Sequence, residues 1–384
     1  MNPQEKIGIV VMFKMNHGGG APRVVVDLIK TLHALGHAAH FLTPWKLDHE
    51  KIKEIFEPIE IEREYNLSTL KSKWCVEPNF SRTLMKKQFQ KMAENVDLII
   101  DIDGGVLHDY LPENKKYVIW RISGIEGEKT EWEKNNVRRK LKNVIKNFLS
   151  PQNNTLSKNH KIYAVDKWTK ERLMEKWNLQ AEKIILYPEI KTTQIKYHPE
   201  NKKNQAIILG RISPNKRIDE SLHIFAQGAK ESDYKLIIIG GVIAESSEYI
   251  QNLKDIAQKE KILDRVEFIQ DPPFELLKKT IQESKILIES QRDISLTMTS
   301  IECLAAGVVV LVHKNGGTFN EVLENGKYGV GFVTIPQAAE KLKKIIKGLA
   351  MNKINPALFT KRAEFFSAEK FKERLTYILK ENGI

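Results

Sequence analysis

The sequence predicts an α/β protein made of two doubly wound units, and three observations lead to this prediction. Short apolar runs alternate with amphipathic stretches along the 384 residues, which is the pattern of parallel strands joined by crossover helices. A polar stretch, EIKTTQIKYHPENKKNQ, interrupts this alternation after Pro188. The length is comfortable for two domains of ordinary size and long for one core. We therefore expect two Rossmann-like domains that face each other across a cleft.

The first series of elements lies in residues 1–190, which we expect to form the N-terminal domain. Helical patterns are clear at Arg23–Leu35 and Lys167–Trp177. In such sheets, ligands bind at the carboxyl ends of the strands. Apolar runs predict strands at Ile7–Phe13, Ala39–Leu42, Leu98–Ile102, Tyr117–Ile122, Ile162–Val165 and Ile184–Tyr187.

The second series follows a linker at residues 191–204 and fills residues 205–365. Helical patterns such as Ser246–Lys259 and Phe274–Ser284 separate its apolar runs. Residues 366–384 predict a C-terminal helix that could pack back on the N-terminal domain. The apolar runs of this series read AIILGRI, KLIIIGG, RVEFIQ, KILIES and VVVLVH.

The formal net charge is +12, and basic residues are densest from about Lys115 to Lys176. This balance favours anionic partners such as nucleotides, phospholipid headgroups or nucleic acid, unless it is only a solvated surface. No helix-turn-helix, zinc finger or aromatic-studded RNA-binding strand accompanies the charge. We therefore do not expect a nucleic-acid-binding protein.

Cysteine usage and hydropathy bear on the compartment. Cys75 and Cys303 are far apart and lack metal-ligand spacing, which favours a reducing compartment and argues against a disulfide framework or a zinc site. The N-terminus has no long apolar signal segment, and no apolar run approaches the ~20 residues that span a bilayer. We expect a cytoplasmic protein, with peripheral contact with the cytosolic face of a membrane left open.

Three glycines, residues 18–20 in KMNHGGGAPR, separate the first predicted strand from the first predicted helix. Glycine tolerates positive φ and lets other groups approach the backbone, so a phosphate or sugar pocket is one interpretation and a plain tight turn is the other. A dinucleotide fingerprint needs G-x-G-x-x-G and a carboxylate after the next strand. This sequence has neither, because its second strand ends in HFLTP, so a nicotinamide cofactor is not expected.

A second motif, LGRISPNKR at residues 209–217, places two cations after a strand end. Arg211 follows Gly210 at once, and Lys216 comes five residues later, after a Ser-Pro-Asn turn. Arginine offers paired hydrogen bonds and lysine a compact charge, so the two side chains could hold a diphosphate between them. The alternative is a basic loop in solvent.

A third motif, ISLTMTSIECLAAG at residues 294–307, predicts a hydroxyl-rich turn that enters a helix. Free N–H groups at a helix start bind phosphate or sugar oxygens. Glu302, inside the helix, could accept hydrogen bonds from a vicinal diol such as ribose, although a helical glutamate is more often a surface charge.

The run Asp101-Ile102-Asp103 is formally a D-x-D, which can hold Mn²⁺ under a nucleotide diphosphate. Such a short pattern is common by chance. Because Arg211 and Lys216 can neutralise a diphosphate, we expect neither a metal nor another cofactor.

Four segments in order resemble the group 1 (family 4) retaining glycosyltransferases of GT-B fold. They are GGAPRVVVDLIKTLHALGH, LGRISPNKRIDESLHIF, IECLAAGVVVLVHKNGG and AEFFSAEKFKERL. The resemblance covers nearly the whole chain and is strongest from Ala206 to Phe332. A finer and weaker resemblance, carried by ILYPEI and SIECLAAG, is to the cytosolic mannosyltransferases that extend lipid-linked oligosaccharides.

The resemblance implies roles for several residues. The family's diphosphate-binding pair falls on Arg211 and Lys216, and the glutamate that contacts the donor ribose falls on Glu302. The amides that hold sugar and phosphates match two residues at the helix start, and the glycines that pack against the donor match two in the first domain. These four residues are Thr297, Met298, Gly19 and Gly20.

Two departures from the family pattern stand out. Ile294 occupies the place of a first glutamate that reads the donor sugar. Either Asp293 takes over by a local shift, or the sugar is recognised differently, or activity is lost. The family also tends to have a histidine at the end of the strand DLIIDIDGG. Here Asp103, or less favourably Asp101, stands there, with His108 a few residues on, and we expect Asp103 near the anomeric carbon as an oxocarbenium-stabilising carboxylate.

The implied activity is transfer of a hexose from a UDP- or GDP-sugar to a hydroxyl of a glycan or lipid-linked acceptor. In this family the leaving diphosphate departs on the face that the acceptor approaches, so no dedicated general base is required. Two other readings stay open: a catalytically silent, glycosyltransferase-like binding subunit, and an NDP-sugar epimerase. The nucleobase, sugar, linkage, acceptor and oligomeric state do not follow from the sequence.

Overall fold

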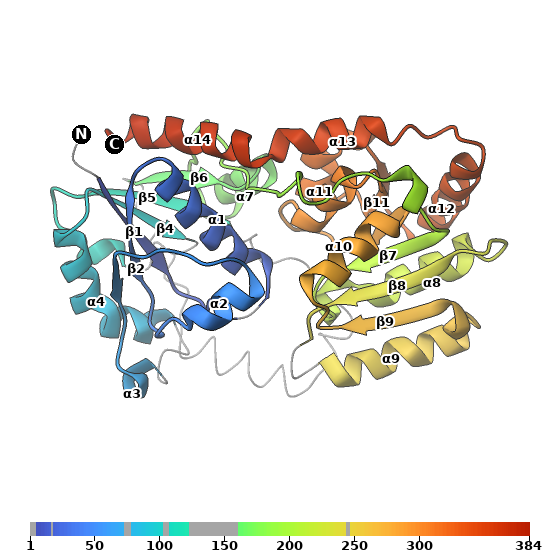
Figure 1. Ribbon diagram of the computed structural model, residues 1–384, viewed down its shortest axis with the longest axis horizontal. Coiled ribbons are helices and arrows are strands. Elements are labelled where there is room, and N and C mark those ends of the chain that lie inside the picture. Colours follow the sequence, from blue (N-terminus) through green and yellow to red (C-terminus); the bar gives the residue numbers. More distant parts are fainter. Residues whose placement is uncertain (1–4, 17, 73–77, 103–106, 123–159, 243–245) are drawn as a thin grey trace. The chain divides into compact units, whose positions relative to one another are not determined.

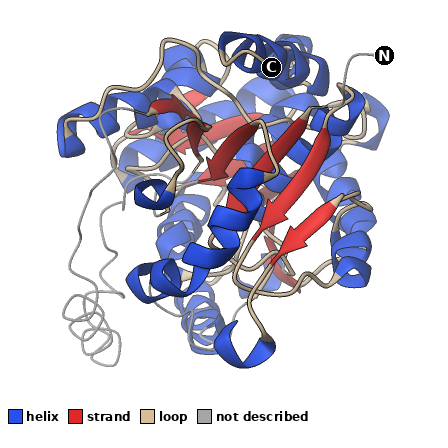
Figure 2. Cartoon of the chain, turned by 90° about the vertical axis from the view of Figure 1, so that its left-hand side faces the viewer, coloured by secondary structure: helices blue, strands red, loops and turns tan. Residues whose placement is uncertain are grey.

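The computed structural model describes residues 5–16, 18–72, 78–102, 107–122, 160–242 and 246–384. The chain divides into two compact units, with the division after Pro188 and a return to the first unit at Phe371. The predicted positions Cys75 and Asp103, and most of the basic stretch, lie outside the described residues. Each unit contains one parallel sheet with helices on its faces (Figures 1 and 2).

The first unit has a six-stranded sheet in the order β3-β2-β1-β4-β5-β6. Every described pairing in it is parallel, and the central strands are almost entirely buried, as expected where helices cover both faces. Its strands are β1 (Lys6–Val11), β2 (Ala38–Leu42), β3 (Arg63–Tyr65), β4 (Leu98–Ile102), β5 (Lys116–Arg121) and β6 (Lys161–Ala164). Its helices are α1 (Gly20–Ala34), α2 (His49–Ile55), α3 (Thr69–Ser72), α4 (Pro78–Glu94), α7 (Lys167–Trp177) and the C-terminal α14 (Ala368–Glu381).

Helix α14, red in Figure 1, completes the core of the first unit. Phe371 is buried and stacks on Trp120 of β5, with ring centroids 5.7 Å apart. Lys116 donates to the Gly383 carbonyl at 2.9 Å, and Arg374 lies over the ring of Tyr187. The C-terminal residues are thus an integral part of this unit.

The second unit repeats the plan, with a parallel sheet in the order β12-β11-β10-β7-β8-β9. If these strands are numbered 1 to 6 from β7 and the sheet is read from the β9 edge, the order is 3-2-1-4-5-6, the same as in the first sheet. This is the arrangement of doubly wound nucleotide-binding folds. Its strands are β7 (Gln205–Leu209), β8 (Lys235–Gly240), β9 (Val266–Gln270), β10 (Ile286–Glu289), β11 (Val309–His313) and β12 (Val330–Phe332). Its helices are α8 (Ile218–Gly228), α9 (Ser246–Lys259), α10 (Phe274–Glu283), α11 (Met298–Ala305), α12 (Ile335–Ala350) and α13 (Ala357–Ala363).

One predicted strand is wrong. Ile184–Tyr187 forms only an isolated bridge, between Ile185 and Ala164. The apolar side chains of this run are buried all the same, and the Leu186 carbonyl accepts a hydrogen bond from the Trp120 indole at 3.0 Å. Burial, and not strand pairing, explains the apolar run.

Among the described residues, no helix combines the length and apolar character needed to cross a bilayer.

Candidate functional site

The candidate site lies in the second unit, where its strand order reverses. Strands β7 and β10 are neighbours there, and the segments that follow them lead into α8 and α11. Open α/β sheets bind ligands at the carboxyl ends of their strands at such a reversal. The two segments are residues 210–217 and 290–297, which overlap two of the motifs predicted from sequence.

The segment after β7 directs a lysine back over the strand end. Gly210 has φ 134°, Arg211 is exposed, and a short 3₁₀ turn, η3 (Pro214–Lys216), follows. A methyl group added at Gly210 would meet Cε of Lys216 at 3.4 Å, so the lysine side chain runs beside this glycine. Lys216 Nζ donates to Oε1 of Gln291, in the segment after β10, at 2.7 Å. The ammonium group is therefore held across the ends of two strands.

The charge of Lys216 is costly in this place. Burial lowers the pKa of the Lys216 ammonium, the charge of Glu289 raises it, and the charge of Arg211 lowers it. Arg211 therefore lies near enough to Lys216 for the two positive charges to repel each other. A bound anion would stabilise the charged lysine and offset its repulsion with Arg211.

Helix α11 begins in a network of hydroxyl groups. Thr297 is its N-cap residue, and its Oγ1 donates to Oε2 of Glu289 at 2.9 Å. Ser300 donates to the same carboxylate oxygen at 2.6 Å. The Thr297 N–H donates to Oγ1 of Thr318 at 3.0 Å, so this amide already has an acceptor. The predicted contact with a phosphate or sugar oxygen therefore remains for Met298, whose N–H stands in the first turn, where amides have no intrahelical acceptor.

Glu302 is 4% exposed in the middle of α11, so it is not the surface charge that a helical glutamate usually is. A buried carboxylate needs hydrogen-bond donors or positive charge around it. Its predicted contact with a donor ribose stays a prediction. The next residue, Cys303, is equally buried, and burial, with Glu302 beside it, raises the pKa of the Cys303 thiol well above its usual value.

The position of the missing family glutamate is packed against a glycine turn. Asp293 has φ 56°, and its N–H donates to the Asn315 carbonyl at 2.7 Å. The Ile294 carbonyl accepts from the Gly317 N–H at 2.9 Å. A methyl group on Gly316 would come within 3.1 Å of that carbonyl oxygen, which explains the glycine. The backbone of this loop is thus fixed, with an apolar side chain at residue 294.

Sequence reasoning missed three residues of this site: Glu289, Gln291 and Thr318. Glu289 offered a signal, since a carboxylate that ends an apolar strand was noticed at Asp103 and overlooked here. Gln291 and Thr318 contact their partners because strands that are distant in the sequence are neighbours in the sheet. No local sequence pattern reveals such contacts.

The first unit presents its glycines at the equivalent strand reversal, between β1 and β4. Gly20 is the first residue of α1, and Gly19 precedes it with φ 168° and ψ 164°. This is extended backbone, so the expected need for positive φ does not apply at Gly19. Close approach of a ligand and a plain tight turn both stay open as interpretations of Gly19.

Only the first aspartate of the D-x-D pattern lies among the described residues. Asp101 is fully buried in β4 and accepts a hydrogen bond from the Tyr117 hydroxyl. Burial, together with the Asp101 charge, raises the pKa of Tyr117 well above its usual value. Asp103 lies outside the described residues. His108 is buried and contacts Asp109, and nowhere in the described chain do three or more His, Cys, Asp or Glu side chains gather as metal ligands would.

Solved glycosyltransferase structures share the fold of the whole chain. A glycosyltransferase from Rickettsia africae ESF-5 has a TM-score of 0.73 at 16% identity and covers 99% of both chains. Anabaena HepE in complex with UDP and glucose has a TM-score of 0.71 at 13% identity, over 98% of this chain and 100% of that one. The predicted fold class, that of GT-B glycosyltransferases, is confirmed.

The second unit matches a family model. Residues 190–365, a little under half of the chain, match the model for glycosyl transferases group 1. A GDP-Man:Man(3)GlcNAc(2)-PP-Dol alpha-1,2-mannosyltransferase from Xenopus laevis is 30% identical over 164 residues, which are 39% of this chain and 33% of that protein. The chain spans about a third of the length of the curated relatives it matches.

Proposed function

We propose that the chain is a retaining glycosyltransferase that moves a hexose from a UDP- or GDP-sugar to a hydroxyl group of a glycan or lipid-linked acceptor. The observation that carries the proposal is the pair Arg211 and Lys216 at the strand reversal, with the lysine partly buried and held by Gln291. The match of residues 190–365 to the family model for glycosyl transferases group 1 supports the proposal. The GDP-Man in the name of the Xenopus mannosyltransferase and the UDP and glucose bound in the HepE structure support a nucleotide-sugar donor.

The two cations would act on the leaving group. Negative charge builds on the diphosphate as the bond to the sugar breaks, and preorganised cations stabilise that charge most in the transition state. Lys216 is already placed by Gln291, so little rearrangement is needed when this charge develops. Asp103 keeps its predicted role beside the anomeric carbon as part of the proposal.

A thermal-shift screen against UDP, GDP, ADP and their sugars tests the donor. A ligand that binds only the native state raises the free energy of unfolding by RT ln(1 + [L]/Kd), which is about 2.7 kcal/mol at a ligand concentration of a hundred times Kd. We expect the UDP or the GDP series to raise the melting temperature. The same screen with Lys216→Ala is the control, and its shift should be much smaller. No shift with any nucleotide would contradict the proposal.

Chelation tests the proposed independence from metals. Because Arg211 and Lys216 can neutralise a diphosphate, transfer measured with purified protein is expected to be unchanged after treatment with excess EDTA. Activity that EDTA abolishes and Mn²⁺ restores would revive a metal role for the D-x-D pattern.

A catalytically silent binding subunit is the second candidate, and the apolar Ile294 in its fixed loop favours it. Both candidates bind a nucleotide sugar. They separate in an assay for hydrolysis and transfer of the bound donor, in which only the enzyme releases nucleoside diphosphate.

The acceptor is the least constrained part of the proposal. The Xenopus relative is named for a PP-Dol glycan, which supports a lipid-linked acceptor and, with it, peripheral contact with a membrane. The net charge of +12 is compatible with anionic headgroups.

A further inference from the structure

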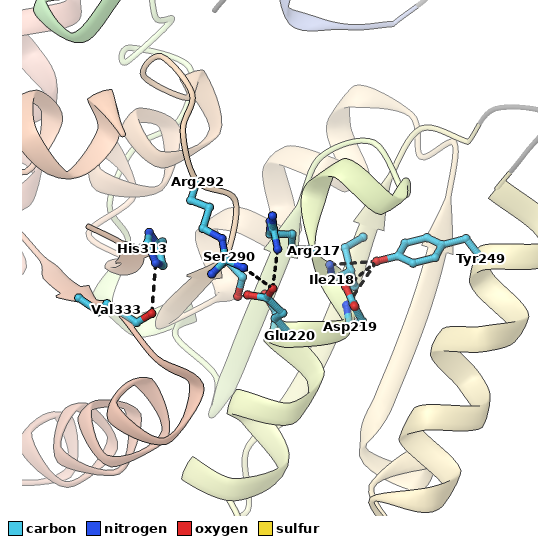
Figure 3. A network of polar contacts seen from close by, with 10 residues as sticks. Arg217, Ile218, Asp219, Glu220, Tyr249, Ser290, Arg292, His313 and Val333 are labelled. Carbon is cyan, nitrogen blue, oxygen red and sulfur yellow. Dashed lines mark hydrogen bonds and ion pairs between the residues drawn. The ribbon is translucent and has the colours of Figure 1, made fainter. Parts of the chain in front are cut away.

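Three successive residues after β10 each contact a residue between Lys216 and Ser221, at the end of the segment after β7 and in the first turn of α8. Ser290, Arg292 and Glu220 are labelled in Figure 3. The Ser290 hydroxyl lies 2.8 Å from the Ser221 hydroxyl in a buried contact. Gln291 accepts from Lys216 at 2.7 Å, and Arg292 donates to Oε1 of Glu220 at 3.0 Å. Side-chain contacts therefore join the segment after β10 to the end of the segment after β7 and to the start of α8.

Glu220 is the anion at the centre of these contacts. Its Oε1 accepts from Arg217 at 2.7 Å as well as from Arg292, so one carboxylate oxygen serves two guanidinium groups. The Arg217 side chain is 7% exposed and that of Glu220 17%, so solvent screens this cluster less than a surface ion pair. Figure 3 shows the two arginines approaching Glu220 from different segments.

The backbone at Arg217 is itself constrained. Arg217 has φ 51° and ψ 44°, a left-handed conformation that is unfavourable for a residue with a side chain. Arg217 precedes α8, but its side chain does not cap the helix. Instead, the Tyr249 hydroxyl accepts hydrogen bonds from the backbone N–H groups of Ile218 and Asp219. Because Lys216 is the residue immediately before Arg217, the direction of the lysine depends on this conformation being held.

We propose that Glu220 is a positioning residue for the diphosphate site, an inference that rests on the function proposed above. By binding Arg217 and Arg292 together, it fixes Lys216 and Gln291, their sequence neighbours, relative to each other. Loss of the Glu220 charge would leave two guanidinium groups facing each other without their common anion. The segments would then separate, and Lys216 would no longer be held beside the strand end where Arg211 projects.

The test is the affinity of purified variants for UDP and GDP, measured by isothermal titration calorimetry. Glu220→Gln keeps the side-chain size and removes the charge, and we expect it to weaken binding of the better nucleotide by about tenfold. Glu231→Gln is the matched control, because Glu231 forms an exposed ion pair with Lys343 on the same unit. It should bind like the wild type. An unchanged or higher affinity of Glu220→Gln would overturn the inference.

A double-mutant cycle separates positioning from general structural support. If Glu220 acts through Lys216, Glu220→Gln should change affinity very little once Lys216→Ala is present. The same tenfold loss in both backgrounds would show a structural role only, and would also overturn the inference. If Glu220→Gln does not fold, Arg292→Gln removes one arm of the cluster and should give a smaller loss with the same dependence on Lys216.

Nucleotide binding by the wild type distinguishes failure of the positioning role from failure of the proposed function. Binding by the wild type that Glu220→Gln leaves unchanged rejects the positioning role and keeps the proposed function. Failure of the wild type to bind UDP, GDP or ADP rejects the proposed function, and the positioning role with it.

Discussion

Replacement of Lys216 by alanine is expected to lower kcat for hexosyl transfer by about a hundredfold, as loss of one preorganised donor to a developing charge often does. The ammonium group is partly buried and held by Gln291, so water cannot readily take its place at the strand end. Arg211→Ala is expected to act in the same direction and by a similar factor. Steady-state kinetics with the donor identified by thermal shift would measure both effects.

The matched control for these variants is Lys344→Ala. Lys344 is exposed and pairs with Glu340 one helical turn away, so its loss should leave kcat within about twofold of the wild type, as expected of a surface pair. Rates near those of the wild type in Lys216→Ala and Arg211→Ala would remove the two cations from the mechanism. A rise in KM with kcat unchanged would assign them to binding of the ground state instead.

Gly240→Ala is expected to lower the free energy of unfolding of the second unit by about 3–5 kcal/mol, through overpacking and backbone strain together. Gly240 is the last residue of β8, with φ 157°, and an added Cβ would overlap the carbonyl oxygen of Gly210. The clash involves backbone on both sides, so no side chain can turn away to relieve it. Urea-induced unfolding would measure the loss.

Its neighbour provides the control. A Cβ on Gly241 would meet Oδ1 of Asp271 at 3.6 Å, an ordinary contact with a side chain, so Gly241→Ala should stay within about 0.5 kcal/mol of the wild type. Because Gly210 directly precedes Arg211, Gly240→Ala should also weaken nucleotide binding where the protein stays folded. Equal stability of the two variants would show that the ends of β7 and β8 separate easily.

Much of the fold could be predicted because its strands are parallel and covered on both faces. Such strands read as unbroken apolar runs, and β4 was predicted with its observed bounds, Leu98–Ile102. Short strands at the sheet edges were missed. Arg63–Tyr65 has two residues that are not buried, and Val330–Phe332 has only three residues and two of them buried, so neither forms a recognisable run.

The candidate site was predictable where it depends on a single strand–loop–helix unit. Arg211 and Lys216 follow one strand, and the start of α11 lies within one motif, so spacing alone indicated them. Glu220 and Gln291 could not be recognised, because their contacts arise from the adjacency of β7 and β10. In the chain, 75 residues separate Lys216 from Gln291.

The return of the chain to its first unit at Phe371 has a consequence for biosynthesis. Trp120 is made early, while the phenylalanine that stacks on it is translated only after the whole second unit. Part of the apolar core of the first unit therefore stays exposed until the second unit has emerged and had time to fold. The first unit should accordingly complete its core only after the second unit has been translated.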